Sequence, residues 1–242
     1  GRSERGKDSI MVSSIEENLK RVKEALAAAA ERSGRDAGEI RLIAVSKTHP
    51  VESIMEAVRC GIEAVGENRI QELEEKRRSW EGPPVDWRFI DHLQTNKVRK
   101  AVEFSSAVDS VDSPRLALAL ARAAEERGTT LPVLVEVNTS GESSKHGVHP
   151  SQAARLVEVL LEECPALRLD GLMTIGPLSD DISEVRRAFA MLRTLRDGLA
   201  RDFGRPLREL SMGMSGDYEQ AVAEGSTMVR IGSAIFGSRS RP

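Results

Sequence analysis

The chain has 242 residues, of which 40% are hydrophobic and 30% charged, and its formal net charge at pH 7 is −3. This length allows two small domains or one large α/β barrel, and the hydrophobic content is sufficient for a real core. The charge balance provides no broad basic field, which argues against nucleic acid as a partner, because sequence-independent binding relies on clustered lysines and arginines.

The ends of the chain and its cysteines bear on the compartment. Residues 1–9 lack the apolar core of a signal peptide, and no apolar run approaches the length of a membrane span. Cys60 and Cys164 lie far apart in apolar, helix-like stretches, which favours buried free thiols in a reducing compartment. We therefore expect a soluble, cytoplasmic protein with no membrane partner, with tails at residues 1–13 and 238–242.

Hydrophobic periodicity predicts strands that alternate with helices along the whole chain. The predicted strands cover residues 42–46, 62–65, 87–90, 105–108, 132–137, 167–172, 208–211 and 227–231. The predicted helices cover residues 14–33, 51–60, 69–79, 96–103, 113–127, 150–163, 181–202 and 217–224, with a last turn at 232–236. Asp112 or Ser113 before Pro114 is a plausible helix start, and Gly128 and Gly204 are plausible helix ends.

Eight strands alternating with helices, in a chain close to the usual barrel length, predict a single-domain α/β protein, a (β/α)8 TIM barrel over residues 14–237. The helix at 14–33 would be an addition to it. An open, doubly wound sheet would alternate in the same way. Against that alternative, Gly213-Met-Ser-Gly216 and the other glycines do not form a G-x-G-x-x-G turn after the first strand.

Lys47 closes the first strand-like run, which extends from Arg41 and breaks at Pro50. A lysine amine forms a Schiff base with an aldehyde only when it is deprotonated, and a partly desolvated strand end favours the neutral amine. Most lysines are exposed, so the competing interpretation is a solvated cap of the next helix. Lys47 is thus a candidate covalent site that needs support from other residues.

Polar residues follow most of the predicted strands, where a barrel places its functional groups. They are Lys47, Glu67 to Arg69, Asp91 to Gln94, Asn138, Thr174, Ser211 to Ser215, and Arg230 to Ser233.

The last two loops have the composition of a phosphate site. Barrels commonly bind phosphate between the loops after strands seven and eight. Met212 to Gly216 provides a hydroxyl and two glycines, and Gly232 and Ser233 open the final turn. Two ordinary glycine turns are the alternative.

Arg230 and Lys47 belong to neighbouring strands of a closed barrel, and their alternation directs both toward its mouth. A lysine, an arginine and a phosphate site together are what a pyridoxal phosphate (PLP) site requires.

The chain resembles the family of pyridoxal phosphate homeostasis proteins, single-domain barrels similar to the N-terminal domain of alanine racemase. The resemblance covers roughly residues 14 to 237. It is carried by Ala44-Val-Ser-Lys47, Gly66-Glu-Asn-Arg-Ile-Gln-Glu72, Phe89-Ile-Asp-His-Leu-Gln-Thr-Asn-Lys97, Val135-Glu-Val-Asn138 through Lys145-His-Gly147, Gly171-Leu-Met-Thr174, Leu210-Ser-Met-Gly-Met-Ser215 and Val229-Arg-Ile-Gly232 through Phe236-Gly237.

The resemblance implies that the cofactor is PLP, held as an internal aldimine by Lys47. It places Arg230 at the pyridine nitrogen and Asn68 near the ring. It also implies that Met212, Ser215, Gly232 and Ser233 belong to the cofactor site, the last three at the phosphate. Because a guanidinium does not readily give up a proton, Arg230 would leave the ring a weak electron sink.

The third strand departs from the family pattern, because Arg88 and Asp91 stand where the family usually has His and Gly. Asp91 would then either accept a positive φ or change the shape of the loop.

The resemblance implies binding more than catalysis. Racemases of this fold place a tyrosine from another domain and subunit opposite the lysine, whereas the only tyrosine here, Tyr218, is interpreted as a surface residue at a helix start. We therefore assign no catalytic residue. The expected function is to hold PLP and to contribute to its supply to apoenzymes, with PLP, apoenzymes and amino acids as partners and a monomer as the oligomeric state. The alternatives are a low-rate, PLP-dependent amino-acid racemase and a barrel that binds a sugar phosphate without a Schiff base.

Two further expectations concern side chains around the barrel mouth. His146 and His149 are three residues apart without a nearby Cys or paired acid, so no metal is predicted. His92 is either an acid or base at the mouth or, by preference, a solvated loop residue. Glu136, if it faces inward, needs a cation such as Arg41; otherwise the fifth strand faces the other way.

Overall fold

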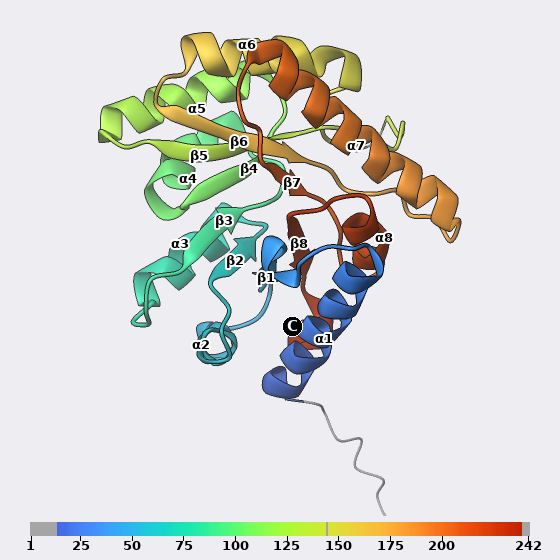
Figure 1. Cartoon of the computed structure of the whole chain (residues 1–242). Coiled ribbons are helices and arrows are strands. Elements are labelled where there is room, and N and C mark those ends of the chain that lie inside the picture. The colour runs from blue at the N-terminus through green and yellow to red at the C-terminus, as the bar shows by residue number, and fades with distance from the viewer. Residues whose placement is uncertain (1–13, 144, 239–242) are drawn as a thin grey trace, which may run out of the picture.

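The structure is a computed structural model that describes residues 14–143 and 145–238. The predicted tails, except for Ser238, lie outside these residues. Eight parallel strands form a closed barrel in which β8 pairs back with β1 (Figure 1). The strands are β1 (Arg41–Val45), β2 (Ala64–Glu67), β3 (Asp86–Phe89), β4 (Ala107–Val111), β5 (Leu131–Glu136), β6 (Leu167–Met173), β7 (Glu209–Ser211) and β8 (Met228–Ile231). The predicted (β/α)8 barrel is confirmed, and the open sheet is wrong because pairing of β1 with β8 leaves no sheet edge.

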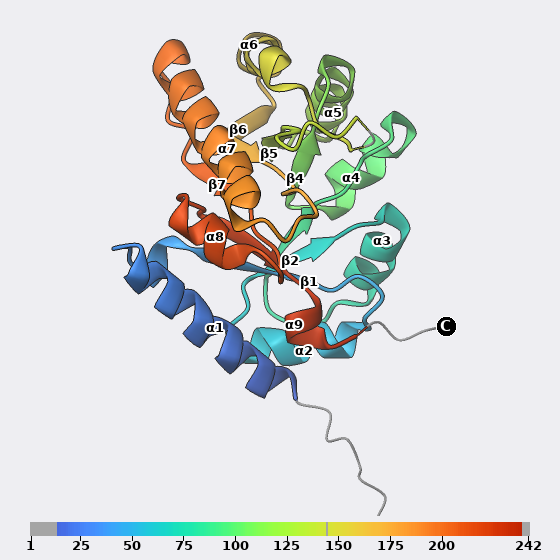
Figure 2. The same ribbon diagram turned by 90° about the vertical axis from the view of Figure 1, so that its right-hand side faces the viewer.

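Helices surround the strands (Figure 2), because a parallel pair needs a connection that returns along the outside of the sheet. The α-helices are α1 (Ile15–Arg32), α2 (Val51–Arg59), α3 (Ile70–Ser79), α4 (Val98–Phe104), α5 (Pro114–Arg127), α6 (Ala153–Glu163), α7 (Ile182–Phe203), α8 (Tyr218–Ala223) and α9 (Ser233–Phe236). Short 3₁₀ turns are η1 (Ala37–Glu39), η2 (Thr95–Lys97) and η3 (Pro150–Gln152). The predicted helix limits at Ser113, Gly128 and Gly204 are confirmed: Ser113 caps α5, and both glycines have left-handed φ.

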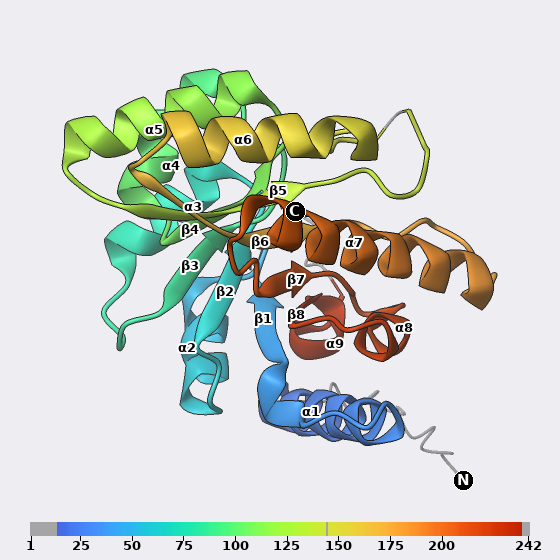
Figure 3. The same ribbon diagram turned by 45° about the horizontal axis from the view of Figure 1, so that its top comes forward.

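The helix α1 is the predicted addition to the barrel, and it packs beside α8 and α9 (Figures 1 and 3). A capping box starts it, in which Ser14 Oγ accepts from the Glu17 N–H at 3.1 Å and the Glu17 carboxylate accepts from the Ser14 N–H. The buried Asn18 donates from Nδ2 to the carbonyl of Ile235 at 2.8 Å. The added helix therefore holds α9, the element that follows the last strand.

The strands β2 and β4 begin later than predicted because the preceding helices use their first residues. Gly61 adopts φ 99°, and the Ile62 N–H donates to the carbonyl of Ala57 at 3.1 Å, which closes the end of α2. Ser105 likewise donates its N–H to the carbonyl of Ala101 at 2.9 Å and ends α4. A residue directly after a helix can therefore close that helix instead of starting the next strand.

Side chains fill the inside of the barrel, so the barrel is a core and not a pore. Five residues form an apolar cluster separate from the larger one between strands and helices; they are Ile43, Ala64, Leu134, Met173 and Met228.

Arg88 lies inside the barrel, since Trp87 and Phe89 on either side of it pack in the outer cluster. Its guanidinium makes a bidentate pair with Asp109, at 2.8 and 2.7 Å, and a third bond to Asp86 at 2.9 Å. Burial disfavours the charge, but Asp109 and Asp86 outweigh it and raise the pKa of Arg88 above its usual value. This departure from the family pattern is thus accommodated as a buried ion pair.

Candidate functional site

A cavity of about 300 Å³ opens at the ends of the strands where a barrel places function. Its walls come from the loops after β1, β2, β3, β6, β7 and β8. The lining residues are Val45, Lys47, His49, Asn68, Ile90, Asp91, Ile175, Met214, Ser215, Gly216, Arg230, Gly232, Ser233 and Gly237.

Six of the seven residues predicted to bind the cofactor line this one cavity: Lys47, Asn68, Ser215, Arg230, Gly232 and Ser233. Met212 is different, since it is fully buried in the outer core, and the lining of its loop begins at Met214. The Met212 side chain therefore packs in the core under the loop and does not face the cavity.

Lys47 is partly buried and lies two residues after the end of β1. The competing interpretation, a cap of the next helix, is wrong because the residue at the N-cap of α2 is Pro50. The residue after Lys47 is unusual: Thr48 adopts φ 68°, the one positive φ at a non-glycine residue in the described part of the chain. The backbone thus turns sharply as it leaves the lysine.

Arg230 provides a fixed cation at the base of the cavity. It is 4% exposed, and its guanidinium donates to Ser211 Oγ at 2.6 Å and to the carbonyl of Thr174 at 2.8 Å. Burial lowers the pKa of Arg230 from its usual value, while nearby carboxylates, first Asp109 and then Glu136, act in the opposite direction. Held from two sides, this side chain can present a hydrogen-bond donor to a ligand in one orientation.

The loops after β7 and β8 place hydroxyls and small residues side by side. Ser215 and Ser233 both line the cavity. Gly232 has φ −113°, so its role is spatial: a Cβ there would lie 3.2 Å from the carbonyl oxygen of Val45. Gly213 has φ 107°, and its Cβ would come within 2.8 Å of Ala221 Cβ. The first glycine admits close approach to β1, and the second lets the β7 loop lie directly on α8.

Asn68 brings an unpaired acceptor to the cavity. Its Nδ2 donates weakly to Asp91 at 3.4 Å, whereas its Oδ1 is buried with no hydrogen-bond partner among the described residues. An unpaired buried polar atom costs free energy, so its position beside a cavity favours a ligand donor there. Asp91 also lines the cavity. Of the two outcomes expected where the family usually has glycine, a positive φ at Asp91 is not the one observed.

Glu136 faces inward, but its expected pairing with Arg41 is wrong. Arg41 binds Asp86 at 2.8 Å, because it starts β1 whereas Glu136 ends β5, at the opposite end of the barrel. Glu136 is 4% exposed, and burial, followed by repulsion from Asp112, raises its pKa to about 7 against the attraction of Arg230. It is thus a carboxyl group poised to titrate near neutral pH.

His146 and His149, three residues apart in the sequence, make separate contacts in the structure. His149 accepts a hydrogen bond from the Ser151 N–H at 3.1 Å, while His146 joins His92 and Asp112 in a group that could offer three ligand atoms. The two rings stack with centroids 4.1 Å apart and planes 9° apart. A metal lies close to the plane of each imidazole that binds it, which two parallel stacked rings do not permit. The expectation of no metal stays a prediction.

Sequence reasoning missed several lining residues because it considered mainly polar side chains. Ile175 and Met214 are exposed by 38% and 44%, and both follow strands whose ends had been singled out. His49 stacks on Phe236 at 5.1 Å, and burial lowers its pKa. Tyr218 begins α8 and packs against the core without lining the cavity.

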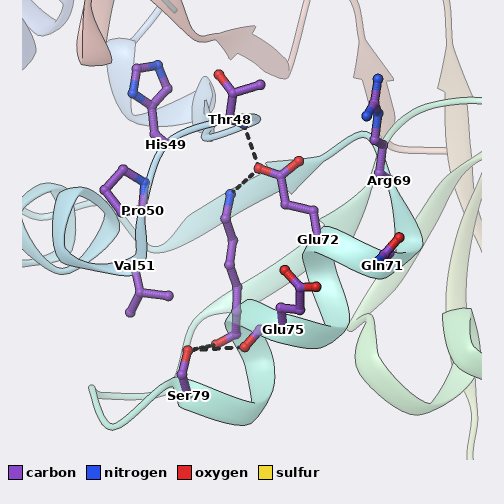
Figure 4. Close-up of a pocket in the computed structure, with 10 residues that line it drawn as sticks. Thr48, His49, Pro50, Val51, Arg69, Gln71, Glu72, Glu75 and Ser79 are labelled. Carbon is purple, nitrogen blue, oxygen red and sulfur yellow. Dashed lines mark hydrogen bonds and ion pairs between the residues drawn. The ribbon is translucent and has the colours of Figure 1, made fainter. Parts of the chain in front are cut away.

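A second hollow, a groove of about 540 Å³, lies between the loop after β1 and helix α3 (Figure 4). His49 lines both hollows. In this groove the Glu72 carboxylate reaches the backbone of Thr48, the residue that follows Lys47. The groove therefore exposes the outer side of the turn whose inner side forms the cavity.

No helix in the described part of the chain is both long and apolar enough to cross a membrane.

Residues 10–240 match the family described as alanine racemase, N-terminal domain. A pyridoxal phosphate homeostasis protein of Bos taurus is 44% identical over 234 residues, covering 91% of this chain and 86% of the relative. One from Aquifex aeolicus is 42% identical and covers 92% of this chain and 97% of the relative. Among solved structures, PipY of Synechococcus elongatus PCC7942 with PLP bound has a TM-score of 0.81 and 35% identity, covering 93% of this chain and all of that one.

Proposed function

The chain belongs to the family of pyridoxal phosphate homeostasis proteins, within the alanine racemase N-terminal domain family, and from this we propose that it binds PLP and contributes to its intracellular supply. The observation that carries the proposal is the convergence of Lys47, Arg230, Ser215 and Ser233 on one cavity. Lys47 follows β1, Ser215 follows β7, Arg230 belongs to β8 and Ser233 begins α9.

The donor set fits PLP. The cavity volume lies at the lower end of the range for ligand sites, which suits a small cofactor. The cavity has an amine for an aldehyde at Lys47 and two hydroxyls for a phosphate at Ser215 and Ser233. Arg230 provides a fixed cation, and Asn68 an unpaired acceptor.

In this proposal Lys47 forms the Schiff base, and Ser215, Gly232 and Ser233 surround the phosphate. Arg230 faces the pyridine nitrogen, and Asn68 lies near the ring. When bound, PLP supplies an electrophilic aldehyde and a ring that can withdraw electrons. The Arg230 guanidinium would hold the ring nitrogen without giving it a proton, so the site favours storage of the cofactor over carbanion chemistry.

The alternative of a low-rate amino-acid racemase has less support, since Tyr218 does not line the cavity. Exchange of a substrate α-proton with solvent would distinguish that alternative from a carrier.

Cellular context completes the proposal. Cys60 and Cys164 are free thiols, which supports a reducing, cytoplasmic compartment. Apoenzymes and amino acids as recipients of PLP, and a monomeric state, belong to the proposal as well.

The test is an absorption spectrum of the purified protein with PLP, before and after borohydride reduction, followed by peptide mapping. We expect one reduced adduct on the peptide that contains Lys47, and its loss in Lys47→Ala. Lys97, on the 3₁₀ turn η2 outside the cavity lining, gives a matched control: Lys97→Ala should retain the adduct. No adduct, or labelling scattered over many lysines, would refute the proposal. It would favour the alternative that the cavity binds a sugar phosphate without a Schiff base.

A further inference from the structure

We propose that Glu72 and Lys76 of α3 are positioning residues for Lys47, which fix the backbone on both sides of it and so aim its amine into the cavity. This inference rests on the proposed function, since it takes Lys47 as the residue that bonds the cofactor. Neither residue is among the cofactor-site residues predicted from the sequence, and neither lines the cavity.

Lys76 holds the residue before Lys47. Its ammonium is almost fully buried, and it donates to the carbonyl of Ser46 at 2.8 Å. It also binds the carboxylates of Glu67 and Glu72, each at 2.8 Å. A buried ammonium is held in place only when acceptors surround it, and here one of those acceptors is the peptide bond between Ser46 and Lys47.

Glu67 ties the same point to the neighbouring strand. Its carboxylate accepts both from Lys76 and from the Ser46 hydroxyl. It is fully buried at the end of β2, and burial raises its pKa although Lys76 acts in the opposite direction. The network thus connects α3, β2 and the residue that precedes Lys47.

Glu72 holds the residue after Lys47. Its carboxylate accepts from the Thr48 N–H at 2.5 Å (Figure 4). Thr48 has φ 68°, a conformation that is unfavourable for a β-branched residue and persists only where the surroundings impose it. Two hydrogen bonds hold this turn: the Thr48 N–H donates to Glu72, and the His49 N–H donates to the carbonyl of Ser46 at 2.9 Å.

The two contacts form one clamp, because Lys76 and Glu72 are joined to each other as well as to the backbone. Lys76 donates to the carbonyl before Lys47, and Glu72 accepts from the N–H after it. Fixing a reactive group in advance improves binding by reducing the ordering that binding requires. The clamp lies on the groove side of the turn, whereas Lys47 lines the cavity.

The first experiment uses the protein without PLP, so that it tests the clamp alone. Hydrogen exchange, read on peptides covering residues 44–52, should show the Thr48 amide exchanging at least about ten-fold faster in Glu72→Ala. The matched control is Glu74→Ala on the same helix, where Glu74 binds Arg78 and Lys100 at the surface. Unchanged exchange in Glu72→Ala would refute the clamp.

The second experiment measures PLP binding and borohydride trapping at Lys47 in the same variants. Glu72→Ala should raise the dissociation constant about ten-fold, because the unclamped turn must be ordered on binding. Adding Thr48→Gly should restore most of that loss, since glycine accepts a positive φ without strain. A merely structural role of Glu72 predicts no such rescue. Faster exchange with unchanged PLP binding would refute positioning of Lys47.

Lys76→Met should weaken PLP binding in the same direction. That variant leaves Glu67 buried without its cation, so Glu72→Ala decides the question if Lys76→Met does not fold. The two proposals also fail separately. An absent adduct in the unmodified protein refutes the PLP site, while the exchange experiment reports on the clamp without any cofactor.

Discussion

Replacing Glu136 by Gln should remove a pH dependence of stability that this buried carboxyl creates. Its pKa is raised from 4.5 to about 7, first by burial and then by Asp112 and Asp91, whereas Arg230 acts against the rise. Between these two pH values the folded state binds more protons at this site than the unfolded state does. The site therefore makes the protein less stable as pH rises through that window.

The magnitude follows from the width of the window. Each pH unit contributes about 1.36 kcal/mol, so the full interval from 4.5 to about 7 corresponds to about 3 kcal/mol. Glutamine has nearly the same shape and does not titrate. Relative to wild type, Glu136→Gln should gain about 3 kcal/mol between roughly pH 5 and pH 8, which is roughly 1 M in the urea midpoint.

The assay is urea unfolding of both proteins without PLP at several pH values across this range. The difference in unfolding free energy between variant and wild type cancels the titration of all other groups. Glu103→Gln, at an exposed glutamate of α4, is the control and should give a flat difference. A flat difference for Glu136→Gln as well, or one of opposite slope, would show that Glu136 is ionised in the folded state throughout.

Two other substitutions test the packing beneath the site. Arg88→Met should lower the unfolding free energy by about 3–5 kcal/mol, because it leaves Asp109 buried without its bidentate partner, and Arg88→Met/Asp109→Leu should recover most of that loss. Urea unfolding checks both, and a loss below about 1 kcal/mol for the single variant would contradict the account. Gly213→Ala should cost more than about 1 kcal/mol and weaken PLP binding, since φ 107° and Ala221 leave no room for a methyl group. Thermal unfolding with and without PLP measures it, and an unchanged midpoint would count against the close approach.

Much of the fold could be predicted because its signals are local. Alternation of strand and helix periods, with caps such as Ser113 and ends such as Gly128, predicted the order of the elements. The boundaries of β2 and β4 were less accurate, since Ile62 and Ser105 serve the ends of helices. The local sequence does not reveal which of two adjoining elements will use a residue that lies between them.

The candidate site was predicted as a set of residues because strand pairing in a closed barrel is sufficient to bring the ends of β1 and β8 together. The pattern could not separate Met212 from Met214, since only packing decides which of the two turns into the core. It also paired Glu136 with Arg41, because opposite charge is visible in a sequence and the end of the barrel at which each residue lies is not.

By itself, the sequence determined the periodicity of eight strands, the positions of the glycines, and the lysine and arginine at two strand ends. The tertiary structure alone decided that Lys76 reaches the carbonyl before Lys47 and that Thr48 is held at a positive φ. Periodicity and capping arise from interactions within a few residues, so they can be seen along the chain. A buried ion network spans elements that meet only after folding, and its partners are selected by distance and burial in three dimensions.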